Sequence, residues 1–505
     1  MRKRRVFLCF LLCAALLTGC AKQQADIVSE TLPKAEDPYT APVGDLGGEY
    51  STLVTLYLPG ADGTQLLPLT EEITFSARPE AETVAKALLA HPAGEEYAAL
   101  PGGGTVTLSG PDAVTVSGGV ASVNLSVAAL SLDHTDFFIL CQALTNTLCA
   151  IGDIAGVNVL VAGVSPGLDI GATLPLGLMV QNLVDDPAML KERLITQRSG
   201  GAKQNTPYRI NAALYFPARS GRGILAEGRM LTITGTSVSD MALALLAQLG
   251  AGAEELSSVP AMPDLVSLLS APPILDEGAQ NVLRLSFKPE FSEALAAAGI
   301  TRSAMMASLV TTMTSFLPNV PLVSVSIGSE QITALTPSGL YSGADQTIGF
   351  SGGHMRRGDF ANFLLTETTL YFAGEDGAPT PTKRAMPASY ARSARALFEQ
   401  LLLGPLYDDT AQGLRRALPK ALMSADLIGI SRVGDTLLIN FSSALLSACQ
   451  GLTPAQESAV VYSIVNTVTE ISGLRRVRFY VDGSQPDTLS GALVLGGEFM
   501  RSVSN

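Results

Sequence analysis

The chain has 505 residues, a formal net charge of −13 at neutral pH and no tryptophan. So acidic a composition argues against a nucleic-acid partner, which needs clustered lysine and arginine to neutralise phosphates. The length allows roughly three or four domains.

The first 19 residues predict a lipoprotein signal peptide. The basic start MRKRR precedes VFLCFLLCAALL, whose length falls short of the about 20 apolar residues of a membrane span. The next residues, LTG before Cys20, resemble a bacterial lipobox. That resemblance implies cleavage before Cys20, attachment of a diacylglyceryl group to its sulfur and an extracytoplasmic, membrane-anchored product. The alternative is an ordinary signal peptide with an incidental cysteine.

Residues 20–49 are predicted to be the lipidated cysteine and a flexible tether. The stretch AKQQADIVSETLPKAEDPYTAPVGDLGGEY is rich in Pro, Gly, Asp and Glu and holds few large apolar side chains. Such a composition buries too little surface to offset the entropy of the chain. The alternative is a pro-segment packed on the domain that follows.

Three sequence landmarks then recur in one order. A first strand reads VTLYL at 54–58, AALYF at 212–216 and TTLYF at 368–372, at intervals of about 157 residues. A second strand reads VASVNLS at 120–126, VLRLSFK at 282–288 and TLLINFS at 436–442. The third landmark is a helix running into a strand that ends at Gly163, Gly328 or Gly483. Self-similarity at nearly fixed spacing indicates tandem copies of one unit.

We therefore predict three modules, named here module 1 (50–182), module 2 (207–350) and module 3 (364–500). Each is expected to run strand, strand, helix, two strands, helix, strand. This order predicts an α+β fold in two layers, with a small mixed sheet packed by two helices. Each module ends in a glycine-rich apolar stretch that either adds an edge strand or joins adjacent modules; the sequence leaves both possibilities open.

Both predicted helices of a module carry local signals. The first one ends at KALLAHP (86–92), ALLAQLG (244–250) or FEQLLLGP (398–405), where Gly404 and Pro405 mark a C-terminus. In module 3 the second helix begins with a capping box, Thr453 and Gln456. Its apolar residues recur at helical spacing, as do those of the matching helices. The three predicted faces are Phe137, Cys141, Leu144 and Leu148; Met306, Leu309, Val310 and Met313; and Val461, Ile464, Val465, Val468 and Ile471.

Cysteine usage does not predict a disulfide scaffold. Cys141 and Cys149 lie eight residues apart in one predicted helix, about 12 Å at 1.5 Å per residue, which is too far for a disulfide. Cys449 has no obvious partner. Cys141 and Cys149 are predicted to be small buried hydrophobic residues, and a disulfide from Cys449 to either of them would require modules 1 and 3 to touch.

No catalytic, cofactor or metal site is predicted. The histidines His91, His134 and His354 form no metal-ligand pattern, and no nucleophile elbow or phosphate loop occurs. Acid pairs that can cleave glycosides do not recur between modules, so solvated charge is the simpler interpretation. The RGD at 357–359 is interpreted as a chance match.

Charge distribution gives one hint of a partner. Residues 50–163 hold 11 acidic and 2 basic residues, whereas 364–483 hold 11 of each. In RRVRFYV, alternation predicts Val477, Phe479 and Val481 in the core and directs Arg476, Arg478 and Tyr480 outward. We hypothesise that this outward face meets an acidic protein or an anionic wall polymer; the simpler alternative is a solvated strand.

The landmarks resemble the GerM domain of sporulation and germination proteins. The resemblance rests on LYF, LLLGP, INFS and VRFYVDG in module 3, and it spans about 50–163, 208–330 and 367–483. It is weakest in module 2, where Ser286 replaces the asparagine and SIG replaces VDG. The family usually has one or two copies. Its members are extracytoplasmic, often lipid-anchored, similar to ring-building modules of the sporulation envelope channel, and not known as enzymes.

The resemblance therefore implies a non-enzymatic, membrane-anchored envelope lipoprotein that mediates assembly or binding in sporulation or germination. The expected partners are the membrane through the N-terminal lipid, other envelope proteins or a cell-wall polymer, and further copies of the chain in a homo-oligomer. The alternative is a cell-wall-directed binding or hydrolase-accessory lipoprotein with no role in spores.

Overall fold

A computed structural model places the chain in two compact units, Met1–Thr40 and Ala41–Asn505. The residues that the structure describes are 37–47, 49–61, 65–76, 80–110, 112–167, 175–184, 186–191, 207–235, 237–343 and 345–502. In the first unit, within 37–40, the backbone N–H of Tyr39 donates to the carboxylate of Asp37 at 3.0 Å. The second unit contains all the helices and strands described below.

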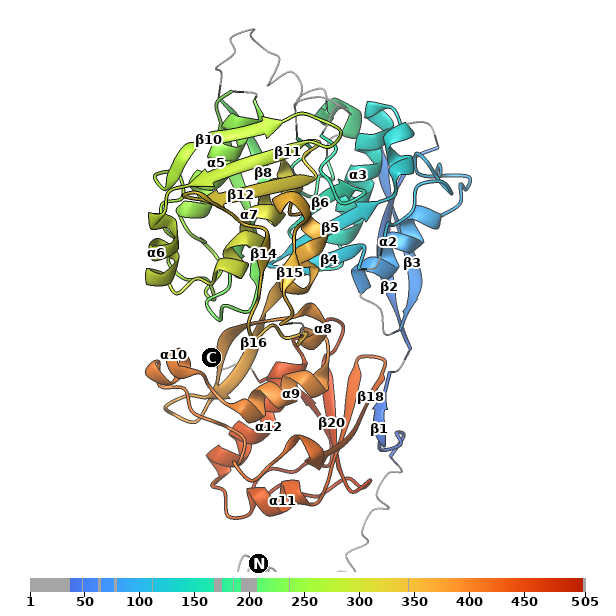
Figure 1. The fold of residues 1–505 in the computed structure, drawn as a ribbon. Helices are drawn as coiled ribbons and strands as arrows, with labels where there is room; N and C mark the ends of the chain where they lie inside the picture. Colours follow the sequence, from blue (N-terminus) through green and yellow to red (C-terminus); the bar gives the residue numbers. More distant parts are fainter. Residues whose placement is uncertain are drawn as a thin grey trace, which may run out of the picture. The chain divides into compact units, whose positions relative to one another are not determined.

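The predicted order of elements occurs in each module (Figure 1). Module 1 contains β2 (Tyr50–Pro59), β3 (Leu66–Phe75), α2 (Glu80–Ala90), β4 (Val114–Ser117), β5 (Val120–Leu125), η1 (Val127–Ser131), α3 (His134–Cys149), β6 (Gly156–Val161) and β7 (Leu178–Met179). Module 2 contains β8 (Tyr208–Pro217), β9 (Ile224–Ile233), α5 (Val238–Gly250), β10 (Leu269–Asp276), β11 (Val282–Phe287), α6 (Glu290–Ala297), α7 (Arg302–Phe316), β12 (Leu322–Ile327), β13 (Glu330–Gln331), β14 (Ala334–Leu335) and β15 (Ile348–Gly349).

Two short helices, η2 (Ser351–Gly353) and η3 (Arg357–Phe363), precede module 3. Module 3 contains β16 (Leu364–Ala373), β17 (Pro379–Met386), α8 (Ala388–Ala391), α9 (Ala394–Leu403), α10 (Tyr407–Ala411), η4 (Ser424–Asp426), β18 (Leu427–Val433), β19 (Thr436–Phe441), α11 (Ala444–Cys449), α12 (Pro454–Val468), β20 (Arg476–Val481) and β21 (Glu498–Met500). The α+β fold predicted from the sequence is confirmed, with several small mixed sheets and helices.

The sheets of the three modules follow one pairing rule. Each has an antiparallel pair (β4 with β5, β10 with β11, β18 with β19), followed by a parallel partner (β6, β12, β20). The parallel step is bridged by the long helix α3, α7 or α12, as a parallel connection requires. Before each sheet comes a hairpin that carries the LYL or LYF strand: β2 with β3, β8 with β9, or β16 with β17.

One hydrogen bond fastens the hairpin to the long helix in every module. The backbone N–H of the landmark tyrosine donates to a threonine Oγ1 on that helix, from Tyr57 to Thr147 at 2.9 Å, from Tyr215 to Thr312 at 3.0 Å and from Tyr371 to Thr467 at 3.0 Å. All three threonines are buried. A buried amide needs an acceptor, so these bonds give a physical reason for the repeated tyrosine strand.

The asparagine in the second landmark also has a structural role. Asn124 Oδ1 accepts the N–H of Gly163 at 2.7 Å, and Asn440 Oδ1 accepts that of Gly483 at 3.1 Å. Gly163 and Gly483 both have a φ of 81°, a conformation that favours glycine. In modules 1 and 3, the asparagine at the end of the second landmark strand is therefore bonded to the glycine that follows the neighbouring parallel strand.

The glycine-rich stretches at the ends of modules 1 and 3 add an edge strand. β7 pairs with β6 and β21 pairs with β20, both antiparallel. An asparagine on the long helix then holds the chain beyond the edge strand: Asn146 bonds the N–H and carbonyl of Asn182, and Asn466 bonds those of Ser502, all at 2.8–3.0 Å. In module 2 the corresponding place on β12 is taken by a single bridge, Val323 with Met355.

The predicted apolar faces of the long helices are confirmed as core positions, except for Ile471. Ile471 is partly buried and lies beyond the end of α12 at Val468. In α7, however, every residue from Ser303 to Phe316 is buried, serines and threonines included. The expectation of one apolar face was too narrow, because α7 contacts β8, β12 and η3. The capping box of Thr453 and Gln456 is confirmed, and α9 ends at Gly404 with a φ of 84°.

Modules 1 and 2 share one hydrophobic core, while module 3 is built around a second one. Ser117 of β4 lies where the modules meet, because its hydroxyl donates to the carbonyl of Leu365 in β16 and accepts the N–H of Ala226 in β9 at 3.0 Å. β9 and β16 also pair directly, so the hairpins of modules 2 and 3 form one four-stranded sheet.

The end of the predicted tether is not loose chain. Gly44–Leu46 form β1, which pairs in parallel with β18 (Figure 1). The prediction of a flexible segment through residue 49 is wrong for these residues, because a distant strand edge supplies the hydrogen bonds that local composition does not reveal.

Among the described residues, no single helix is long and apolar enough to cross a membrane. α6 and α7 pass that test only when taken together, and the chain bends by 104° between them.

Candidate functional site

The predicted lipid anchor, Cys20, and the predicted signal peptide lie outside the described residues. The three later cysteines carry free thiols, with Cys141 and Cys449 buried and Cys149 partly buried. Burial raises the pKa of Cys449 to about 11. The thiolate is the reactive form of cysteine, so this thiol is suited to packing rather than to chemistry.

The predicted binding face on β20 is less open than expected. Val477, Phe479 and Val481 are buried in the core of module 3, as predicted. Tyr480, however, is only 2% exposed, so the prediction that it faces solvent is wrong. It pairs in register with Asn440, a buried side chain that donates to the carbonyl of Pro42. Residues paired in register lie on the same side of a sheet, and at this end that side is occupied by the N-terminal segment.

The arginines of β20 remain partly exposed, but carboxylates of the chain accompany them. Arg476 bonds Asp435 at 2.6 Å and Glu498 at 3.0 Å. The hydrogen bond from Arg476 holds the pKa of Asp435 below its usual value. Arg478 lies opposite Glu498 in the sheet register. These acids reduce the positive charge that the face can offer to an anionic partner.

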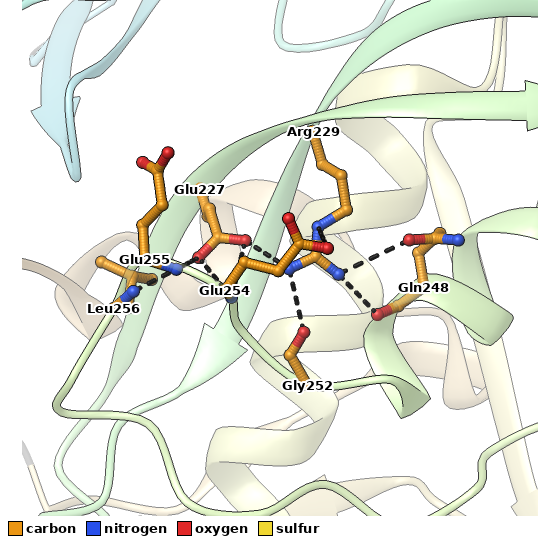
Figure 2. Close-up of polar contacts among 7 residues, drawn as sticks. All are labelled: Glu227, Arg229, Gln248, Gly252, Glu254, Glu255 and Leu256. Carbon is orange, nitrogen blue, oxygen red and sulfur yellow. Dashed lines mark hydrogen bonds and ion pairs between the residues drawn. The ribbon is translucent and has the colours of Figure 1, made fainter.

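Figure 2 shows a buried ion pair in module 2 with the polar groups that surround it. The side chains of Glu227 and Arg229 on β9 are 2% and 5% exposed and form a direct ion pair. Glu227 accepts the N–H groups of Glu254, Glu255 and Leu256 at 2.9–3.3 Å. Both carboxylate oxygens are therefore occupied, which suits a structural role and leaves no place for a substrate.

Arg229 also ties the hairpin to the end of α5. It donates to the carbonyls of Gln248 and Gly252 at 3.3 and 2.9 Å, and it lies 5.5 Å from the ring centre of Phe216. Arg384 of module 3 does the same with the carbonyls of Gln400 and Gly404, over the ring of Phe372.

Module 1 has an acidic residue at the position where modules 2 and 3 have Arg229 and Arg384. The two arginines lie opposite the residue three places before the landmark tyrosine, and in module 1 that register position belongs to Glu71. Glu71 bonds His91, just after α2, at 3.0 Å. His91 is thus a structural histidine that joins hairpin to helix end.

A cavity of about 860 Å³ is the candidate binding site. It is lined by residues of all three modules and of η3, and three arginines line it against one acid, Asp112. We name it the arginine cavity, after Arg356, Arg357 and Arg392. Tyr341 and Tyr390 form part of its wall, with ring centres 5.7 Å apart in an edge-to-face pair. A basic cavity in a chain with a net charge of −13 focuses positive potential locally.

Arg357 is fixed in the wall of this cavity. Its guanidinium donates to the hydroxyls of Tyr215, at 3.1 Å, and of Ser315, and to the carbonyl of Thr311 at 3.4 Å. Burial alone would raise the pKa of Tyr215, but the adjacent guanidinium favours the phenolate and the net pKa is lowered. Ser122 of module 1 completes the contact, with its hydroxyl 2.9 Å from that of Tyr215.

The cavity offers arginines, tyrosines and Ser122, a set suited to binding an anionic group. Within the described part of the chain, no group of three or more His, Cys, Asp or Glu side chains is placed to hold a metal ion. The sequence does not predict that Arg357 lies in the wall of a cavity, and its RGD triplet was interpreted as a chance match. Its partners lie 42 to 235 residues away, so no local pattern marks it.

Comparison with known proteins gives a family match for two regions. The model of the Germane family, described as sporulation and spore germination, matches residues 55–166 and 369–487. These regions fall in modules 1 and 3. A comparison with curated proteins found no match.

Solved structures of sporulation domains are also similar to the chain. The tandem GerMN domains of the sporulation protein GerM from Bacillus subtilis match with 17% identity and a TM-score of 0.21, over 60% of this chain and 98% of that chain. The first GerMN domain of the same protein matches with 20% identity and a TM-score of 0.20, over 28% and 94%. A lipoprotein structure from Clostridium perfringens matches with 22% identity and a TM-score of 0.19, over 27% and 87%.

Proposed function

Two regions of the chain match the Germane family of sporulation and spore germination, and from this premise we propose that the protein is an envelope component that acts by binding in one of these processes. It is anchored to the outer face of the membrane through Cys20 and catalyses nothing. The family match carries the sporulation part of the proposal. The arrangement of polar groups supports the binding part.

The strongest polar clusters in the described residues serve the fold. The carboxylate of Glu227 accepts three backbone N–H groups and pairs with Arg229. Arg384 binds the end of α9 and pairs with Asp409. Buried charges with satisfied partners are typical of structural networks. The arginine cavity differs because it combines basic side chains with open volume, so it is the place where a partner would bind.

We further propose that module 2 is a diverged third copy of the same domain. The Tyr215 to Thr312 bond repeats the one that fastens the hairpin in modules 1 and 3. The sheet pairings of module 2 also follow theirs. Module 2 has Ser286 at the position where modules 1 and 3 have the landmark asparagine, which is the divergence that this proposal includes.

A second candidate function is binding of an anionic cell-wall polymer without any role in spores. Arg356 and Arg392 in the cavity wall favour it, because guanidinium groups bind carboxylates and phosphates in bidentate geometry. A wall-binding protein would be needed in growing cells as well as in sporulating ones.

Site-specific photo-cross-linking in the organism that encodes the chain tests both candidates. A photoreactive residue replaces Tyr390 in the cavity wall, and the matched control replaces Tyr407, which is exposed on α10 outside the cavity. We expect cross-links to envelope proteins from position 390 only, during sporulation or germination. Cross-links to wall polymer in growing cells would favour the second candidate. Equal cross-linking from both positions would contradict a binding role for the cavity.

A further inference from the structure

The segment 41–46, named here the clip, docks on a sheet that lies almost 400 residues away in the sequence. β1 pairs with β18 in parallel, with Gly44 opposite Gly429, Asp45 opposite Ile430 and Leu46 opposite Ser431. The clip directly precedes module 1, yet it adds the outermost strand to the sheet of module 3. An unpaired sheet edge is a ready template for another extended segment.

Gly429 makes this close approach possible. A Cβ atom at this position would lie 2.6 Å from the carbonyl oxygen of Pro42 and 2.8 Å from the backbone nitrogen and oxygen of Gly44. All three atoms belong to the backbone of the clip, so no side-chain rotation can relieve the clash. The register of β18 also shifts between Leu427 and Gly429. The backbone of β18 is therefore irregular next to Gly429, where the clip pairs with it.

Asn440 gives the edge a second means of holding the clip. Its Nδ2 donates to the carbonyl of Pro42 at 2.9 Å. The matching residue of module 1, Asn124, donates in the same way to Ser109, which belongs to module 1 itself. The asparagine side chain of module 1 therefore binds a carbonyl of module 1 itself, whereas the asparagine side chain of module 3 binds a carbonyl of the clip.

Arg395 binds the carboxylate of Asp45, the acidic residue of the clip. Its Nε and Nη2 bond Oδ2 and Oδ1 of Asp45 at 2.5 and 2.7 Å, which is the bidentate geometry of arginine and carboxylate. The same Nη2 donates to the carbonyl of Leu427 at 3.0 Å, which fixes the guanidinium beside β18. The arginine is oriented by module 3 itself, so its position does not depend on the clip alone.

Among the apolar side chains of the clip, Pro42 is buried and Ala41 is partly buried. Val43 and Leu46 are 76% and 59% exposed while the clip is docked. Recognition therefore rests on strand pairing, the space left by Gly429, the buried Pro42 and the carboxylate of Asp45. These are the features by which a sheet edge selects an extended peptide.

We propose that this edge of module 3, formed by β18, Gly429, Asn440 and Arg395, is a strand-docking site for an extended peptide with a carboxylate, and that its native ligand is the clip. The proposal does not depend on the function proposed above. Docking joins the N-terminal tether to module 3 as well as to module 1. A force on the N-terminus then reaches module 3 through the clip rather than through the whole length of the chain.

Peptide binding to the full-length chain tests the site. Asp45→Arg disables the internal clip by placing two like charges together. The probe is a labelled peptide of residues 40–47, TAPVGDLG, with blocked ends, measured by fluorescence anisotropy. We expect saturable binding to the Asp45→Arg chain, and at least tenfold weaker binding to the wild type, where the clip already occupies the edge. Absence of binding to the Asp45→Arg chain at millimolar peptide would overturn the proposal.

Variants of the edge separate specific docking from adsorption. Adding Arg395→Asp to the Asp45→Arg chain should abolish binding of the peptide and should restore docking of the chain's own clip by exchanging the two charges. Hydrogen exchange at residues 44–46 and 427–433 should rise in the single variants and return toward wild type in the double variant. Arg302→Asp, which removes a surface ion pair with Glu330, is the matched control and should leave these amides unchanged. Equal exchange in the single and double variants would also overturn the proposal.

Discussion

Single polar atoms explain why short stretches of this sequence repeat. The landmark tyrosines share a backbone N–H that points away from the hairpin partner and finds a buried threonine hydroxyl. The landmark asparagines share a bond to a glycine N–H. The sequence shows that these residues recur, and it predicts the strands that contain them. It does not predict the bonds, because donor and acceptor lie 39 to 97 residues apart.

Replacement of the threonine tests the lock between hairpin and helix. Thr467→Val keeps the volume of this buried side chain but leaves the N–H of the partly buried Tyr371 without its acceptor. We expect the free energy of unfolding of module 3 to fall by about 1–3 kcal/mol. Thr467→Ser, which keeps the oxygen, should lose no more than about 1 kcal/mol for the missing methyl group. Urea unfolding measures both, and a valine variant as stable as wild type would contradict the assigned bond.

Glu457 of α12 provides a pH-dependent test. Its buried carboxylate accepts the N–H groups of Ser490, Ala492 and Leu493 at 2.8–3.0 Å. Burial raises its pKa, but these bonds dominate and the net pKa is lowered. A lowered folded-state pKa stabilises the fold above the unfolded value of about 4.3, and this contribution is lost as the pH falls through the folded-state pKa.

The corresponding variant is Glu457→Gln. It should be less stable than wild type by about 1–3 kcal/mol at pH 7, because its amide nitrogen cannot accept the backbone N–H groups. The difference should shrink steadily below about pH 4, because the Glu457 carboxylate of the unfolded chain then takes up a proton while the folded chain, with its lowered pKa, still holds it ionised. Denaturant unfolding at pH 7, 5 and 3.5 measures it. A difference that is constant across this range would show that the charge of Glu457 is not what holds the loop.

At the scale of elements, the sequence predicted the two main helices of each module and the two central strands of each sheet, but not the short helices α6, α8, α10 and α11. The capping box of Thr453 and the glycine end of α9 lie where local signals place them. The outer strands were not predictable in this way. β7 and β21 have only two and three residues, and β1 has three. Each of these segments is a strand because it pairs with the edge of a sheet. Composition does not report such pairing, so it predicted β1 to be part of the flexible tether.

The asparagine on the long helix is expected to hold the outer strand in place. Asn466→Leu removes both hydrogen bonds to the backbone of Ser502. We expect amide exchange at 498–502 to accelerate at least tenfold, while exchange in the core strand β19 stays unchanged. Asn146→Leu should act in the same way on 178–182 of module 1. Unchanged exchange in both segments would mean that strand pairing alone holds them.

At the scale of the whole molecule, the modules do not stand apart as the sequence repeat suggests. Modules 1 and 2 share a core, Ser117 links strands of all three, and β9 pairs with β16. Repeat spacing cannot reveal such contacts, because it reports what the modules have in common and not which side chains fill the space between them. Arg357 and the arginine cavity arise at these contacts, which is why sequence reasoning placed the binding face on β20 instead.

The shared core predicts how the chain unfolds. Phe137→Ala opens a cavity in module 1 and should cost about 3–5 kcal/mol. Hydrogen-exchange protection should then fall in the central strands of modules 1 and 2 together, while β19 of module 3 is affected less. Ile464→Ala is the matched change in the second core and should lower protection in module 3 first. A Phe137→Ala variant in which module 2 keeps full protection would contradict the shared core.

We have proposed that this chain serves spore formation or germination by binding other molecules. The most direct test is the yield of heat-resistant spores, and their rate of germination, in a strain that lacks the gene, with a strain complemented by the wild-type gene as control. The account predicts a deficit in at least one of the two quantities, restored by complementation. Normal yield together with normal germination in the deletion strain would contradict it.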